Sequence, residues 1–179
     1  MNFVVVSANH ILVIKHKKTQ NDKETLIFVG EVRLEKSKRY SLADNIMQIS
    51  KIRKDDAGLY ICHYQSDPVS ELVHVLDVQY PPKMVSASED KQVTKGDSVT
   101  LECSATGNPT PTITWSKVGG HMPSGQESEE GFSLTLDEVN RHVEGTYQCT
   151  ADNQVGEPVS AQMAITVVYP PEIITEKVC

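Results

Sequence analysis

The sequence predicts an all-β protein that is built from two tandem domains. Short apolar runs of strand length alternate with turn residues, and no segment keeps the 3.6-residue period of an amphipathic helix. Turn residues such as Gly107-Asn108-Pro109, Gly119-Gly120 and Asp67-Pro68 separate these runs. The length of 179 residues is sufficient for two small domains.

Two motifs recur at nearly the same spacing, which indicates an internal repeat. Tyr80-Pro81-Pro82 returns as Tyr169-Pro170-Pro171 about 90 residues later, each time after alternating apolar residues that predict a strand with one buried face. Gly58-x-Tyr60-x-Cys62 returns as Gly145-x-Tyr147-x-Cys149 at almost the same distance. Two independent motifs with a common period favour a repeated domain over coincidence.

The double prolines mark the domain boundaries. Proline has no N–H for the strand ladder and forces the preceding residue into an extended conformation, so each Tyr-Pro-Pro ends a strand and begins a short, stiff linker. We therefore expect one domain at residues 1–79 and another at residues 80–169, with residues 170–179 beginning a third.

The second half of the chain resembles an immunoglobulin domain of the I-set subclass. It contains Cys103, Trp115 and Cys149 in that order, with Tyr147 two residues before the second cysteine. The resemblance extends over roughly residues 11–179 and implies tandem immunoglobulin-like β-sandwiches. Three phrases resemble the neural adhesion group of lachesin, klingon and the IgLON proteins: Leu76-Asp77-Val78-Gln79-Tyr80-Pro81-Pro82, Gly145-Thr146-Tyr147-Gln148-Cys149 and Ala151-Asp152-Asn153.

The resemblance implies structural roles for the residues of this signature. Cys103 and Cys149 would form the disulfide that joins the two sheets, and Trp115 would pack against it. Tyr147, and Tyr60 at the matching position of the first domain, would lie in the core.

The first domain departs from the pattern. No cysteine precedes Cys62, and Ile14 stands where the tryptophan is expected. A longer spacing between Ile14 and Cys62 leaves room for two more strands and is typical of a V-like domain. The few residues before Ile11 are too short for two strands, so we expect an N-terminally truncated domain that lacks half of one sheet and a signal peptide. Cys62 and Cys179 would then remain unpaired.

The resemblance of the first domain to V-type domains implies a salt bridge. Arg39 would pair with Asp56 at the turn before Tyr60, in the bidentate geometry that Arg forms with carboxylates. Val143 stands where Asp56 would repeat in the second domain, so the pair belongs to the first domain alone.

The resemblance also implies a function in recognition, through the front sheet of the first domain. Side-chain alternation places Tyr60 and Cys62 inward, so their neighbours on the strand point outward. The resemblance implies an immunoglobulin-superfamily cell-surface partner, bound homophilically or heterophilically, at the surface of neural cells. The candidate interface residues are Leu26, Phe28, Ile61, His63 and Gln65.

Two other functions remain open, namely a soluble ligand or decoy and a cytosolic structural array of immunoglobulin domains. The parent protein is expected outside the cell or at the plasma-membrane surface. Membrane association is expected only through parts outside this chain, because no apolar run approaches the roughly 20 residues of a membrane helix.

Composition and motifs exclude other classes of function. The net charge of −7 argues against a nucleic-acid partner, which would require a basic face. The six histidines lack a metal-ligand spacing, apart from a weak possibility of zinc between His16 and His63, so we expect no metal and no cofactor. Nucleophile, P-loop and zinc-protease motifs are absent, so we expect neither an enzyme nor a small-molecule substrate.

Overall fold

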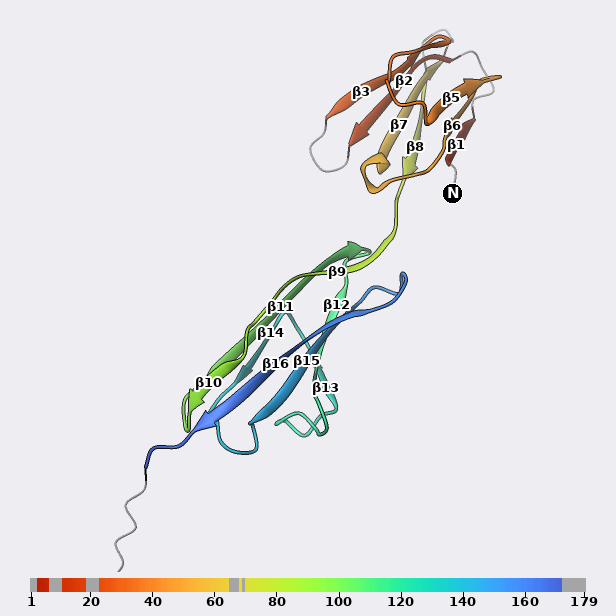
Figure 1. The fold of residues 1–179 in the computed structure, drawn as a ribbon. Helices are drawn as coiled ribbons and strands as arrows, with labels where there is room; N and C mark the ends of the chain where they lie inside the picture. The colour runs from red at the N-terminus through yellow and green to blue at the C-terminus, as the bar shows by residue number, and fades with distance from the viewer. Residues whose placement is uncertain (1–2, 7–10, 19–22, 65–67, 69, 172–179) are drawn as a thin grey trace, which may run out of the picture. The chain divides into compact units, whose positions relative to one another are not determined.

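The chain folds into two compact units, Met1–Val78 and Gln79–Cys179, which we call the first and second unit. The structure, a computed structural model, describes residues 3–6, 11–18, 23–64, 68 and 70–171. Each unit places one β-sheet against another (Figure 1), which confirms the predicted all-β class. Among the described residues the one helical element is the short 3-10 turn η1 (Lys54–Asp56).

The first unit contains a five-stranded antiparallel sheet in the order β4-β3-β2-β7-β8 and a three-stranded antiparallel sheet in the order β1-β6-β5. Their inward side chains form one apolar core that includes Ile14, Met47 and Tyr60. The strands are β1 (Phe3–Val6), β2 (Ile11–Lys18), β3 (Glu24–Val29), β4 (Val32–Arg33), β5 (Tyr40–Ala43), β6 (Ile46–Ile49), β7 (Gly58–Tyr64) and β8 (Ser70–Leu76).

Strand β1 corrects the expectation that half of one sheet is absent. Val5 pairs with Met47 on β6, and its side chain is fully buried. Leu101 pairs in the same way with Leu134 in the second unit, so β1 matches the strand that carries Cys103.

The second unit repeats this plan with two additional strand pairings. Its sheets have the orders β10-β16-β15-β12-β13 and β14-β11-β9, and β10 runs parallel to β16. The strands are β9 (Tyr80–Ala87), β10 (Lys91–Thr94), β11 (Val99–Asn108), β12 (Thr112–Lys117), β13 (Ser128–Glu130), β14 (Ser133–Leu136), β15 (Gly145–Asp152) and β16 (Val159–Val168).

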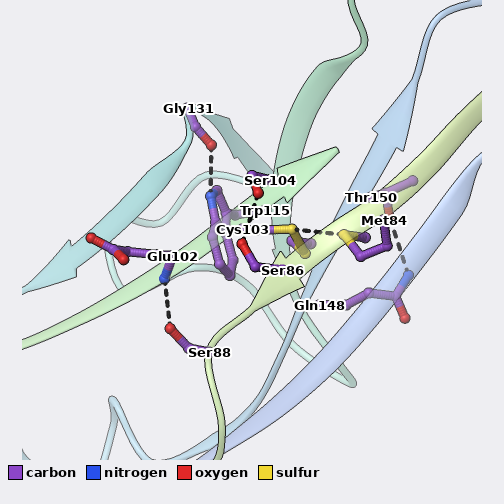
Figure 2. Close-up of a disulfide and its surroundings, with 11 residues drawn as sticks. Met84, Ser86, Ser88, Glu102, Cys103, Ser104, Trp115, Gly131, Gln148 and Thr150 are labelled. Carbon is purple, nitrogen blue, oxygen red and sulfur yellow. Dashed lines mark hydrogen bonds between the residues drawn. A yellow bond between two sulfur atoms is a disulfide. The ribbon is translucent and has the colours of Figure 1, made fainter. Parts of the chain in front are cut away.

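A disulfide joins the sheets of the second unit. Cys103 and Cys149 are bonded, with their Cα atoms 6.5 Å apart, which confirms the expected bridge (Figure 2). Trp115 is fully buried, and its indole Nε1 donates a hydrogen bond to the carbonyl of Gly131 at 2.9 Å. The indole therefore fills the core without leaving its polar atom unpaired.

Both units share a tyrosine that ties a strand to the preceding turn. The hydroxyl of Tyr147 donates to the carbonyl of Val143 at 2.6 Å, and that of Tyr60 donates to the carbonyl of Asp56 at 2.7 Å. Gly58, two residues before Tyr60, has a φ of +142°, and a Cβ there would collide with the Lys17 carbonyl. The glycine of the repeated motif is thus needed so that β7 can pair closely with β2.

Candidate interaction surface

The outward face of the five-stranded sheet of the first unit, here called the front face, carries aliphatic side chains in register. Leu26, Val73 and Val75 are exposed, and Leu59 and Ile61 between them are half-buried. Cross-strand pairing arranges the face in three rows: Leu26, Lys15, Ile61 and Val73; Glu24, Lys17, Leu59 and Val75; and Val29, Val13, His63 and Glu71.

Phe28 does not belong to this face, which corrects the sequence-based assignment. Its side chain is 3% exposed and packs in the core. The β2–β3 register passes from Ile14 opposite Phe28 to Lys15 opposite Leu26, so Ile27 is an extra residue in a β-bulge. A bulge interrupts alternation, and here Ile27 and Phe28 are both buried. Phe28 thereby fills core volume beside Ile14, which is smaller than the tryptophan at the matching place.

The other candidate residues have different positions. Leu26 is 44% exposed on the front face, and Ile61 and His63 are half-buried on the same face. Gln65 lies outside the described residues. Val73 and Val75 of β8 also lie on this face and were not among the predicted interface residues. Alternation along their strand could have identified them, because each is the cross-strand partner of an outward residue of β7.

The charges of the front face lie between and beside the aliphatic side chains. Lys15 Nζ lies 3.9 Å from Glu24 Oε2, and His63 Nδ1 lies 4.0 Å from Glu71 Oε2. These exposed contacts contribute little to the free energy of unfolding. They place both signs of charge around the apolar centre, where charges favour orientation and selectivity in binding.

The matching face of the second unit is polar and serves as an internal comparison. Gln162 donates to Gln148 at 2.8 Å, and Gln148 donates to the hydroxyl of Thr150 at 3.3 Å. The rows there consist of Glu130, Thr114, Thr150 and Ser160, and of Ser128, Ser116, Gln148 and Gln162. The same sheet position is therefore aliphatic in one unit and hydrophilic in the other.

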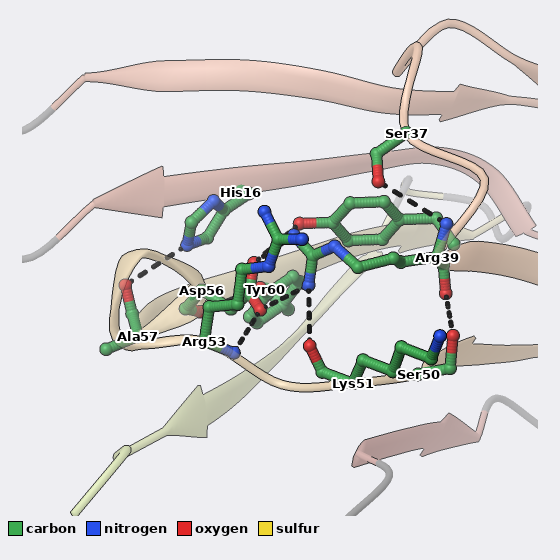
Figure 3. A network of polar contacts seen from close by, with 10 residues as sticks. His16, Ser37, Arg39, Ser50, Lys51, Arg53, Asp56, Ala57 and Tyr60 are labelled. Carbon is green, nitrogen blue, oxygen red and sulfur yellow. Dashed lines mark hydrogen bonds and ion pairs between the residues drawn. The ribbon is translucent and has the colours of Figure 1, made fainter. Parts of the chain in front are cut away.

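A polar network supports the sheets at one end of the first unit (Figure 3). Arg39 donates from Nη1 to Asp56 Oδ2 at 2.6 Å and from Nη2 to Oδ1 at 2.8 Å. The amide of Arg53 donates to Asp56 Oδ2 at 2.7 Å, and the hydroxyl of Tyr40 donates to Oδ1 at 3.3 Å. The Asp56 carboxylate is thus buried with its oxygens satisfied, as a buried charge requires.

The pKa values of Asp56 and of the neighbouring His16 are both lowered. Burial by itself raises the pKa of Asp56, but the hydrogen bonds from Arg39 and the Arg53 amide outweigh it and hold the pKa below its ordinary value. Burial lowers the pKa of His16, although its hydrogen bond with the Ala57 carbonyl acts in the opposite direction. His16 stacks on Tyr60 with ring centroids 4.5 Å apart and belongs to the interior, whereas His63 lies on the front face.

Cys62 is a buried thiol with no disulfide to a described residue, and Cys179 lies outside the described residues. Burial raises the pKa of Cys62 to about 11, so the thiol is protonated at neutral pH. Within the described residues, His, Cys, Asp and Glu form no group of three or more that could hold a metal ion. The same residues include no helix long and apolar enough to cross a membrane.

The sequence is similar to vertebrate proteins. An immunoglobulin domain family model matches residues 81–153. Limbic system-associated membrane protein of Rattus norvegicus is 35% identical over 165 residues, which are 87% of this chain and 47% of that protein. The Gallus gallus protein of the same name is 36% identical over the same shares. The chain thus spans about half the length of the curated relatives it matches.

Solved structures match both units. The structure of Dpr11 IG1 bound to DIP-gamma IG+IG2 matches with a TM-score of 0.79 and 28% identity, over 93% of this chain and 90% of the matched chain. The structure of Dpr2 Ig1-Ig2 in complex with DIP-Theta Ig1-Ig3 matches with a TM-score of 0.78 and 31% identity, over 93% of this chain and 60% of the matched chain.

The paired sandwiches, the disulfide packed with tryptophan and these matches define an immunoglobulin-domain protein. More particularly, its sequence resembles the IgLON group, which confirms the resemblance expected from the sequence. These matches support the expectation that the chain is not an enzyme.

Proposed function

We propose that the chain is a recognition module that binds an immunoglobulin domain of a protein partner through the front face of its first unit. The observation that carries this proposal is the aliphatic front face, with Leu26 at 44%, Val73 at 44% and Val75 at 69% exposure, beside the polar matching face of the second unit. Several exposed aliphatic side chains gathered on one face are typical of an interaction site. The matched structures support a partner of this class, since both are complexes between immunoglobulin-domain proteins.

The proposal includes the setting in which binding occurs. We place the protein outside the cell or at the plasma-membrane surface, in neural adhesion or axon guidance, with a homophilic or related heterophilic partner. The name of the curated relatives, a membrane protein of the limbic system, supports this setting. The Cys103–Cys149 bridge also supports it, because structural disulfides persist in oxidising compartments and are rare in the cytosol, where a structural array would reside.

The proposal keeps the division into domains at residues 1–79 and 80–169. The division of the structure into two compact units between Val78 and Gln79 supports these boundaries. Residues 172–179, most of the segment expected to begin a third domain, lie outside the described residues.

A bead-aggregation assay tests the proposed binding. Beads carrying the chain are mixed with one another and with beads carrying the Rattus norvegicus relative. Leu26→Asp and Val73→Asp should each weaken aggregation about 10- to 100-fold, because a charge enters the apolar centre of the interface. Thr150→Asp, on the matching face of the second unit, is the control and should leave aggregation unchanged.

Two results would contradict the proposal. One is that neither bead pair aggregates with the unmodified chain. The other is that Thr150→Asp weakens aggregation as much as Leu26→Asp, since binding would then not depend on the front face.

A further inference from the structure

The second unit has an apolar groove at the side where both of its sheets end. β13 is the last strand of one sheet and β14 is the last strand of the other. The groove has a volume of about 410 Å³ and is lined by Thr110, Pro111, Thr112, Ile113, Glu130, Gly131 and Phe132. It belongs wholly to the second unit and includes no residue of the front face.

Phe132 lines this groove and directly precedes β14, whose alternation would predict a buried side chain at this position. It precedes Leu134 and Leu136 in the alternation that places side chains inward, and both leucines are buried, yet Phe132 is 70% exposed. An aromatic ring of this size exposed beside an apolar groove marks a surface that a partner can cover.

Backbone hydrogen bonds explain the position of the ring. Gly131, at a φ of +151°, donates its N–H to the Ile113 carbonyl at 3.0 Å and accepts from Trp115 (Figure 2). The next carbonyl, that of Phe132, accepts from the Cys103 amide at 3.0 Å. The chain therefore crosses from one sheet to the other between these two residues, and the ring lies beyond the edge of the sandwich. These backbone groups are already paired, so they do not offer hydrogen bonds to a ligand.

The charges around the groove are acidic. Glu130 is the one charged residue among those that line it. In the strand register, Glu102 lies opposite Ser133, the residue after Phe132, and Asp152 lies opposite Thr112, which lines the groove; both carboxylates are exposed. A cation that binds here would meet carboxylates and the face of an exposed ring, which also attracts cations.

We propose that this groove is a second docking site, for a polypeptide segment of a protein partner that presents an apolar side chain beside Lys or Arg. The apolar side chain would cover Phe132 between Pro111 and Ile113. The cation would pair with Glu130. Both features are needed, because the ring provides the area that is buried and the carboxylates select the sign of the charge.

Amide chemical shifts of the full chain, titrated with two short peptides, test this site. Acetyl-Arg-Leu-Arg-amide should shift the amides of Ile113, Gly131 and Phe132 with a Kd on the order of 1 mM, as suits a small ligand with few contacts. Acetyl-Glu-Leu-Glu-amide should bind at least about 10-fold more weakly, because its charge has the same sign as the rim.

Variants separate the ring from the charge. Phe132→Ala and Glu130→Lys should each weaken binding of the basic peptide about 10-fold, and Val85→Ala and Glu157→Lys, which alter exposed residues elsewhere on the unit, should not. Trp115 fluorescence during thermal unfolding verifies that the variants fold. Unchanged binding in Phe132→Ala, equal binding of the two peptides, or no shifts at these amides would each overturn the proposal.

Discussion

Replacement of Asp56 by asparagine tests the polar network of the first unit most directly. The carboxylate accepts two hydrogen bonds from Arg39 and one from the Arg53 amide, all between 2.6 and 2.8 Å. Asparagine has nearly the same shape but no charge, and its NH₂ group would face a donor of Arg39. The substitution therefore removes the charge-assisted part of the network and leaves the packing almost intact.

The expected loss follows from the burial of the two partners. A hydrogen bond to a charged group contributes about 1.5–3 kcal/mol, and breaking a buried pair costs about 3–5 kcal/mol. The Arg39 side chain is 18% exposed and can regain water, which places the loss near the lower end. We expect Asp56→Asn to reduce the free energy of unfolding of the first unit by about 2–3 kcal/mol.

Each unit contains its own probe of unfolding. Cys62 is buried in the first unit, so its labelling by a maleimide reports the opening of that unit in a Cys179→Ser background. Trp115, the single tryptophan of the chain, reports the second unit by fluorescence. With an m-value of about 1 kcal/mol/M in urea, the midpoint of Cys62 labelling should fall by about 2–3 M.

The neighbouring exposed residue provides the control. Asp55→Asn removes the same charge one residue away and should leave the labelling midpoint of Cys62 within about 0.5 M of the unmodified chain. The reasoning fails if Asp56→Asn has no larger effect than Asp55→Asn. It also fails if the Trp115 transition shifts as far as the labelling of Cys62.

Three further predictions concern burial, pH and the disulfide. Phe28→Asp should destabilise the first unit by about 3 kcal/mol or more because its ring is in the core, whereas Leu26→Asp should leave the Cys62 labelling midpoint nearly unchanged. Burial lowers the pKa of His16, so the unfolded state binds a proton more readily than the folded state. The first unit should therefore lose stability as the pH falls below 6.5, the ordinary pKa of histidine. His16→Gln should flatten this pH dependence in urea titrations at several pH values. Removal of the Cys103–Cys149 bridge, which spans 46 residues, by replacing both cysteines with alanine should lower the stability of the second unit by about 3–4 kcal/mol in Trp115 fluorescence and leave Cys62 labelling unchanged.

The repeat made most of the fold predictable from sequence. Glycine, tyrosine and cysteine at fixed spacing each have a physical requirement in this sandwich, namely a positive φ at Gly58, a buried hydroxyl contact at Tyr60 and an inward position at Cys62. Strand β1 was not predictable in the same way, because Phe3–Val6 is a short apolar run without alternation.

The site was less predictable, because a single extra residue changes which side chains are exposed. Alternation counted from the start of β3 places Phe28 on the same face as Leu26, the front face, but the extra residue Ile27 in the bulge turns Phe28 into the core. The exposure of Phe132 is hidden in the sequence for a related reason, since its spacing from Leu134 is that of a buried residue. The position of a bulge or of a strand end depends on pairing with segments that are distant in sequence. The local periodicity of the sequence carries no information about that pairing.

The tyrosine hydrogen bond shared by the two units offers a route by which a duplicated domain can diverge. In both units the hydroxyl contacts a main-chain carbonyl four residues earlier, so the side chain at that earlier position is not constrained by the contact. One copy has Asp56 there, where it holds Arg39, and the other has Val143, which is buried among apolar neighbours. The bond preserves the corner while the residue that supplies its acceptor is free to acquire a new role.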